Sequence, residues 1–90
     1  MSDVVENTAK SRFELTENGL PAWADYCRQG DRLVIPHVEA HPDLRGSGAA
    51  GRLMEGVLGI ARRDGLKVVP LCGYAAAYMR RHKEHQDLLA

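Results

Sequence analysis

The stretch DLRGSGAAGRLMEG, residues 43–56, decides what kind of fold this chain adopts. Its glycines at positions 46, 48 and 51 match the spacing G-x-G-x-x-G of dinucleotide-binding loops. Glycines after a strand let the backbone approach a ligand closely, and the free N–H groups of a helix that begins there attract negative charge. Arg45 and Arg52 flank this turn and offer positive charge to a pyrophosphate. The stretch predicts either a phosphate-binding turn or a plain turn that starts a helix.

The surrounding sequence argues against a nicotinamide dinucleotide. A Rossmann domain needs a strand that runs directly into the first glycine, and an acidic residue about 20 positions further on at the end of the next strand. Here HPDLR (41–45) separates the strand from Gly46, and LKVVPL (66–71) carries no carboxylate. A chain of 90 residues is also too short for a two-lobed dinucleotide enzyme.

The residues before the glycine-rich turn favour antiparallel strands. Asn18-Gly19 and Gly30-Asp31 are turn signals between alternating or β-favouring runs. Pro36 cannot donate to a strand ladder, which predicts a bulge or one-sided pairing. The expected strands begin at Val4-Val5 and continue with SRFEL (11–15), LPAWADYC (20–27) and RLVIPHVEA (32–40).

The residues after the turn favour a helix, a strand and a second helix. Apolar residues recur at three- and four-residue spacing, which predicts a helix over Ser47–Asp64 that ends before Gly65. LKVVPL follows as a strand parallel to RLVIPHVEA, and GYAAAYMRRH (73–82) as the second helix. We therefore expect an α/β (α+β) fold, a mixed, mostly antiparallel sheet packed by two helices, in a single domain of residues 1–90.

The composition limits the kinds of partner molecule and the cellular location that we expect. Twelve basic and twelve acidic residues give a formal net charge of zero, so we expect no nucleic-acid or membrane partner. MSDVVENTAK does not resemble a secretion signal, so we expect a cytoplasmic protein with free thiols, and Cys27 in the core. The histidines at 41, 82 and 85 lack a spacing with a third ligand, so we expect no metal site.

The segment VEAHPDLRGSGAAGRLM (38–54) resembles motif A of the GNAT acetyltransferases, R/Q-x-x-G-x-G/A. Arg45, Gly48 and Ala50 fall on its defining positions. Over roughly residues 3–88 the chain is similar to the very small, stand-alone GNAT proteins of the YjdJ type. The shared elements are F-x-L at 13–15, P-x-C-x-Y at 70–74 and R-H at 81–82. The chain departs from that pattern at 37–40, where HVEA replaces H-T-x-V.

The resemblance implies that acetyl-coenzyme A is the cosubstrate. It implies that the loop and helix start bind the pyrophosphate through backbone amides, and that the strand before the loop offers its backbone to the pantetheine arm. The residues implied to bind coenzyme A are Val38, Ala40, Arg45, Gly46, Ser47, Gly48, Ala49 and Ala50. The basic run RRHKEH (80–85) is either a solvated helix end or a contact for the 3′-phosphate.

Three positions are candidates for catalysis. Cys72 lies beside the expected position of the thioester, and the start of the second helix would lower the pKa of its thiol. Alternatively, Cys72 is a small apolar residue of the core. Tyr78 is either a general acid toward the departing thiolate or part of the apolar stripe with Tyr74. Glu39 or its neighbour His37 either removes a proton from a substrate ammonium or is simply solvated.

The resulting hypothesis is an acetyl-CoA-dependent N-acetyltransferase that acts on a primary amine. The sequence does not specify the acceptor, which is a protein lysine, an N-terminus or a small amine. The alternative hypothesis is a CoA- or acyl-CoA-binding module with little or no catalysis. A third hypothesis is an interaction domain that binds its partner through the edge of the sheet. We expect a monomer or weak dimer.

Overall fold

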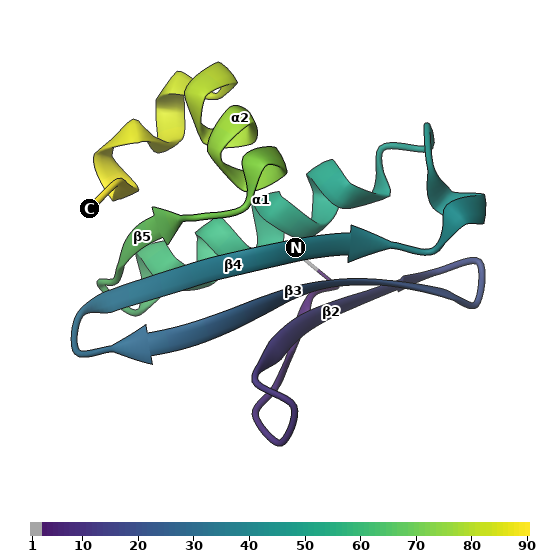
Figure 1. The fold of residues 1–90 in the computed structure, drawn as a ribbon, viewed down its shortest axis with the longest axis horizontal. Coiled ribbons are helices and arrows are strands. Elements are labelled where there is room, and N and C mark those ends of the chain that lie inside the picture. The colour runs from purple at the N-terminus through teal and green to yellow at the C-terminus, as the bar shows by residue number, and fades with distance from the viewer. Residues whose placement is uncertain (1–2) are drawn as a thin grey trace.

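A computed structural model of the chain describes residues 3–90. These residues form a five-stranded sheet in sequential order. The first four strands pair antiparallel, and the fifth lies parallel to the fourth, as expected from the sequence (Figure 1). The strands are β1 (Val5–Asn7), β2 (Arg12–Glu17), β3 (Leu20–Gln29), β4 (Arg32–Ala40) and β5 (Lys67–Pro70).

A two-residue turn joins β2 to β3 at the predicted place. Asn18 and Gly19 both have positive φ, 53° and 73°, and Glu17 pairs with Leu20 across the hairpin. Turns with two positive φ values twist in the same sense as the strands that they connect. The Asn-Gly signal in the sequence is therefore confirmed.

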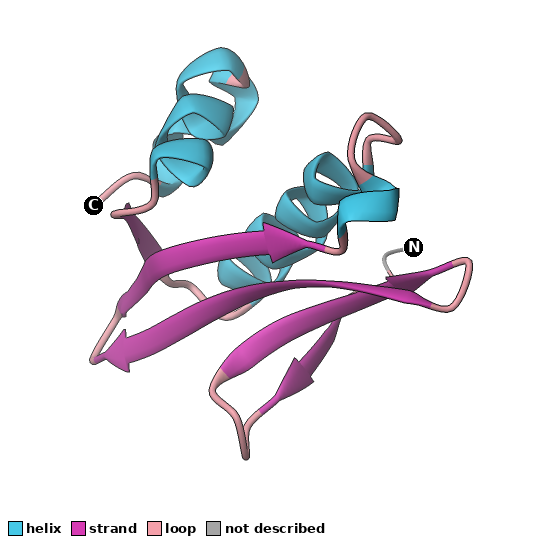
Figure 2. Cartoon of the chain, turned by 45° about the vertical axis from the view of Figure 1, so that its right-hand side comes forward, coloured by secondary structure: helices cyan, strands magenta, loops and turns pink. Residues whose placement is uncertain are grey.

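Two helices lie on the same side of the sheet (Figure 2). They are α1 (Ala49–Arg63) and α2 (Gly73–Arg81), with the short 3-10 helices η1 (Pro42–Leu44) and η2 (Lys83–Leu88). Helix α1 begins two residues later than expected because its N-cap, Gly48, has a φ of 88°, which no helical residue adopts. The C-terminal segment packs back on the fold through buried Leu88 and a parallel bridge from Leu89 to Val68.

The core lies between α1 and one face of the sheet. Alternating residues of β2, β3 and β4 bury their side chains on this face, and the apolar stripe of α1 covers them. Small alanines in β3 let the helix approach the sheet closely. The buried residues on the two sides are Phe13, Leu15, Ala22, Ala24, Leu33, Ile35, Leu53, Met54, Val57, Leu58 and Ala61.

A β-bulge in β4 changes which side chains face the helices. Asp25 pairs with His37 and Cys27 with Val34, so two steps along β3 match three along β4. Ile35, before the bulge, is buried under the helices, whereas after it Val38 points to the helix side and His37 to the other face. The bulge that Pro36 predicts is therefore confirmed.

Strands β4 and β5 separate beyond the bulge. β5 pairs only with Arg32–Ile35 of β4. The N–H groups of Leu71 and Cys72 then both donate to Ile35 O, at 3.0 and 3.1 Å, and the chain turns into α2. The last five residues of β4, 36–40, are left without a neighbour on the β5 side. This open edge is the feature around which the candidate site is built.

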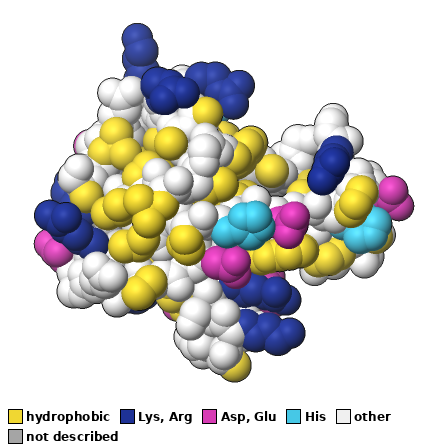
Figure 3. Space-filling view, viewed as in Figure 1, with side chains coloured by type: hydrophobic (Ala, Val, Ile, Leu, Met, Phe, Trp, Pro, Cys, Tyr) yellow, Lys and Arg dark blue, Asp and Glu magenta, His cyan; other side chains and the backbone are white. Residues whose placement is uncertain are grey.

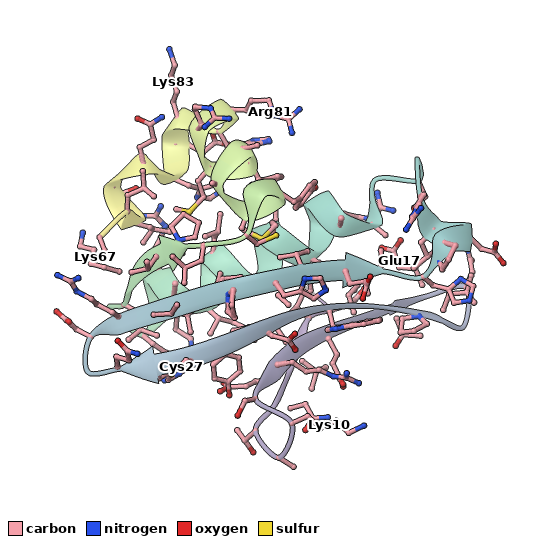
Figure 4. All side chains as sticks on the ribbon, viewed as in Figure 1. Lys10, Glu17, Cys27, Lys67, Arg81 and Lys83 are labelled. Atoms are coloured by element: carbon pink, nitrogen blue, oxygen red, sulfur yellow. The ribbon has the colours of Figure 1, made fainter. Side chains whose placement is uncertain are left out.

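The face of the sheet away from the helices has no covering layer among residues 3–90 (Figure 2). Cys27 lies on this face and is exposed, as the labelled view in Figure 4 shows, so its expected place in the core is wrong. The reason is the alternation of β3, in which Ala22 and Ala24 point to the helices and odd-numbered residues to the bare face.

Candidate functional site

The main chain of Val38 and Ala40 points toward the open edge of β4. The His41 N–H donates to Pro21 O at 2.8 Å, on the β3 side. Because successive residues of a strand direct their N–H and C=O groups to opposite sides, those of Ala40 and Val38 point away from β3. The Val38 N–H faces the Cys72 sulfur across this gap, and the peptide group of Ala40 faces the groove.

The loop after β4 is held by its own hydrogen bonds. His41 Nδ1 accepts from the Asp43 N–H at 3.1 Å, and Leu44 is buried. The Ser47 hydroxyl donates to Leu44 O at 2.6 Å and accepts from the Ala49 N–H at 3.2 Å. Ser47 thus fixes the shape of the loop from within.

The start of α1 presents free N–H groups. Within residues 3–90, the N–H groups of Gly46, Gly48, Ala50 and Gly51 have no hydrogen-bond acceptor. Gly46 has a φ of 80°, and a side chain there would meet no atom within 4 Å, so the space before the helix is open. Free N–H groups at the positive end of a helix dipole are suited to bind phosphate.

The two flanking arginines have different roles. Arg52 forms two hydrogen bonds of 2.7 Å to Glu17, so its charge is already paired in this structure. Arg45 makes no ion pair with any residue of 3–90 and is exposed. The guanidinium of Arg45 is thus the available cation at the loop.

A groove connects the open strand edge to the loop. Its first part, of about 190 Å³, is lined by Val38, Glu39, Ala40, Arg45, Ala50 and Tyr74. Its second part, of about 290 Å³, is lined by Ala40, Leu44, Arg45, Gly46, Gly48, Ala49, Ala50, Gly51 and Tyr74. The parts share four residues, so they form one channel. Of the residues expected to bind coenzyme A, every one except Ser47 lines it.

Comparisons with known proteins bear on the family and the fold. A family model described as GCN5-related N-acetyl-transferase matches residues 12–88. The chain belongs to the GCN5-related N-acetyltransferase family. The NMR solution structure of a GCN5-like protein from Staphylococcus aureus has a similar fold, with a TM-score of 0.75 and 23% sequence identity over 100% of this chain and 91% of that chain. The comparison with curated proteins gives no match.

Tyr74 is a groove residue that the sequence did not single out for this site. It lies in the first turn of α2, is 36% exposed, and lines both parts of the groove. In the sequence it belongs to the same apolar stripe as Tyr78. Only the packing of α2 beside β4 shows that Tyr74 forms a wall of the groove in this GCN5-related protein.

Cys72 is the N-cap of α2 and is half-buried at the mouth of the gap between β4 and β5. Burial raises the pKa of its thiol, but the N–H groups of Ala75, Tyr74 and Val38 face the sulfur and hold the pKa below its usual value. The helix start therefore has the electrostatic effect that the sequence suggested. No histidine or carboxylate of residues 3–90 is bonded to this thiol.

Tyr78 is directed away from the groove. Its hydroxyl donates a hydrogen bond to Glu55 of α1, and its ring stacks on His82 with centroids 3.9 Å apart. Burial and the bond to Glu55 raise the pKa of this hydroxyl far above its usual value. The hydroxyl thus stays protonated near neutral pH, with Glu55 as its acceptor.

Glu39 and His37 are brought together on the bare face. His37 Nε2 lies 3.3 Å from Glu39 Oε2, and about half of each side chain is exposed. Glu39 also lines the groove, at the open edge of β4. These two residues therefore lie where the groove meets the bare face of the sheet.

A further cluster lies on the far side of α1. The Glu55 carboxylate accepts from Tyr78 and lies 2.9 Å from His85 Nε2, and ligand atoms of Glu55, Glu84 and His85 lie within 4.8 Å of one another. The sequence spacing of the histidines does not reveal this grouping. Glu55 and His85 are bonded to each other, so the cluster has a structural role that needs no ion.

No helix formed by residues 3–90 combines the length and the apolar character needed to cross a bilayer.

Proposed function

We propose that this protein is an acetyl-CoA-dependent N-acetyltransferase that transfers an acetyl group to a primary amine. The observation that carries the proposal is the continuity of the groove. The main chain of Val38 and Ala40, which has no strand partner on the β5 side, leads within one channel to the free N–H groups at the start of α1. A ligand with a strand-like amide arm at one end and a phosphate at the other matches this order of groups.

Each part of the channel has a partner on coenzyme A. The pantetheine amides would pair with the peptide groups of Val38 and Ala40, as an added strand does. The pyrophosphate would lie at Gly46 and the first turn of α1, beside Arg45. Arg81 at the end of α2 and Lys83 at the start of η2 point away from the sheet (Figure 4), and the basic run to which they belong is the candidate for the 3′-phosphate.

The chemistry follows from the position of the thioester. A thioester carbonyl beside Val38 would accept a hydrogen bond from its N–H in place of the Cys72 sulfur, which that N–H faces in this structure. Such a bond stabilises negative charge on the oxygen in the transition state. The amine nitrogen then forms a bond to the carbonyl carbon, and the bond to sulfur breaks. His37 and Glu39 take the proton that the substrate ammonium must lose, and the second amine proton goes to the departing thiolate.

Cys72 and Tyr78 have supporting roles in this proposal. Direct transfer needs no acyl-cysteine, so the Cys72 thiol shapes the pocket beside the acetyl group. Tyr78 acts as the acid toward the thiolate only if its hydroxyl leaves Glu55, its acceptor in this structure. That bond is the observation that favours the second candidate function, a CoA-binding module with little catalysis.

Binding and transfer are tested separately. We expect calorimetric titration to show micromolar binding of acetyl-CoA and no binding of NAD. We expect release of free coenzyme A in the presence of a panel of primary amines, with mass spectrometry to identify the acetylated product. Binding without any amine-dependent release favours the binding module, whereas binding of NAD alone contradicts both functions.

We further propose that residues 1–90 act as one domain, in the cytoplasm, as a monomer or weak dimer. The single buried cluster formed by the sheet and α1 supports the first point. Analytical ultracentrifugation measures the oligomeric state directly.

A further inference from the structure

Tyr74 carries the one side-chain hydroxyl among the described residues that line the groove. In the part of the groove at the start of α1, every lining residue other than Tyr74 and Arg45 is apolar or a glycine. Figure 3 shows hydrophobic side chains between α2 and β4, with Lys and Arg side chains gathered at the top of the molecule. A polar group on a mostly apolar wall is suited to orient a ligand.

The Tyr74 hydroxyl lies over the first turn of α1. Its oxygen is 3.8 Å from the position that a Cβ would take at Gly51, the third residue of this helix. The N–H groups of Ala50 and Gly51 have no acceptor within residues 3–90. The hydroxyl therefore lies beside the same helix start whose free N–H groups are suited to bind phosphate.

The Tyr74 hydroxyl is free to donate a hydrogen bond. It has no hydrogen-bond partner within residues 3–90, whereas the hydroxyls of Tyr26 and Tyr78 both donate to carboxylates. Burial raises the pKa of the Tyr74 hydroxyl above its usual value, so the hydroxyl keeps its proton near neutral pH. A protonated hydroxyl without a partner forms a strong hydrogen bond when the acceptor is an anion.

We propose that the Tyr74 hydroxyl donates a hydrogen bond to the pyrophosphate of acetyl-CoA. This inference rests on the proposed binding of acetyl-CoA and assigns a further binding residue to the groove. Arg45 is the one cation among the described residues that line the groove, and a pyrophosphate carries more negative charge than one guanidinium neutralises. A neutral donor on α2 shares that charge from the side opposite Arg45's loop, so the ligand contacts both helices.

Three acetyl donors locate this contact. Acetyl-CoA has a pyrophosphate and a 3′-phosphate, acetyl-dephospho-CoA keeps only the pyrophosphate, and S-acetylpantetheine has neither. Calorimetry measures the first two donors, and NMR titration measures S-acetylpantetheine. We expect Tyr74→Phe to weaken the first two about tenfold or more and S-acetylpantetheine less than about twofold, because only the first two offer the charged acceptor.

Tyr26→Phe is the matched control, because it removes a hydroxyl of β3 that does not line the groove. It keeps the wild-type affinity for all three donors. Thermal unfolding of Tyr74→Phe should match that of the wild type, since the missing hydroxyl has no bond within residues 3–90 to lose.

The other outcomes separate this inference from the proposed function. Equal affinities of wild type and Tyr74→Phe for all three donors overturn the inference and leave acetyl-CoA binding standing. Weakening of acetyl-CoA alone assigns the hydroxyl to the 3′-phosphate, and equal weakening of S-acetylpantetheine assigns it to the pantetheine arm, so either result overturns the pyrophosphate contact. A fall in kcat at unchanged affinity also overturns it. A wild type that binds none of the donors contradicts the proposed function itself.

Discussion

Arg52 binds Glu17 through two hydrogen bonds of 2.7 Å, which tie the first turn of α1 to the end of β2. The same guanidinium donates to Ser47 O at 3.0 Å. The β2–β3 hairpin and the glycine-rich loop before α1 are therefore connected through one side chain, and Arg45 remains the cation that lines the groove.

This connection predicts that removing the charge of Arg52 and removing the charge of Glu17 weaken acetyl-CoA binding equally. We expect Arg52→Ala and Glu17→Gln each to weaken acetyl-CoA binding by less than about fivefold, because each loosens the loop through an exposed ion pair. Isothermal titration at low and moderate salt measures both. If Arg52 instead contacts phosphate, Arg52→Ala weakens binding far more than Glu17→Gln, and that result contradicts the structural role.

Gly46 provides a test of the phosphate cradle. We expect Gly46→Asp to weaken acetyl-CoA binding at least about tenfold more than Gly46→Asn, because only aspartate puts a negative charge beside the pyrophosphate. Both side chains enter the same open space at a φ of 80°, and asparagine and aspartate both tolerate this region. Gly48 is less suitable, since a Cβ there would lie 2.9 Å from Arg52 Nη1.

The control for the Gly46 pair is thermal unfolding. Both variants should lose similar stability, about 1 kcal/mol or somewhat more, from the strained backbone conformation. Equal affinities of the two variants for acetyl-CoA would place the pyrophosphate elsewhere.

The lowered pKa of Cys72 predicts its reactivity. In a Cys27→Ser background, we expect alkylation of Cys72 to reach half its maximal rate below the usual thiol pKa of about 8.5, because the thiolate forms at lower pH. The unfolded protein in urea supplies the reference. Since the unfolded thiol holds its proton to higher pH, folding stability should rise as the pH rises between the two pKa values.

Cys72→Ala tests the route of acetyl transfer. We expect reduced but measurable turnover and retained binding of acetyl-CoA, because direct transfer forms no covalent enzyme intermediate. Cys72→Ser keeps the size and polarity of the side chain and serves as the matched variant. Mass spectrometry of the wild type decides the point independently. A stoichiometric acetyl adduct on Cys72 that an amine discharges would establish a two-step route.

Tyr78→Phe separates packing from acid catalysis. We expect a loss of about 1 kcal/mol in unfolding free energy from the missing bond to Glu55, and a decrease in kcat of less than tenfold. Glu55→Gln is the comparison, because it weakens the same bond while leaving the hydroxyl in place. A drop in kcat of a hundredfold or more in Tyr78→Phe alone, with unchanged acetyl-CoA affinity, would identify the hydroxyl as the acid.

The sequence by itself determined the strands, the helices and the loop that binds phosphate in our proposal. These features depend on local rules: alternation in β2 and β3, positive φ at Asn18-Gly19, and a lost donor at Pro36 that forces a bulge. Each rule acts within a few residues, so it can be recognised without knowing what packs against the segment.

Only the tertiary structure decided which side chains meet. Arg52 and Glu17 are 35 positions apart, and Tyr78 and Glu55 are 23 apart, so no periodicity links them. Cys27 is exposed because nothing among residues 3–90 covers the second face of the sheet, and Tyr74 lines the groove because α2 packs beside the open edge of β4. Such contacts depend on how distant segments pack together, and a local pattern carries no information about that packing.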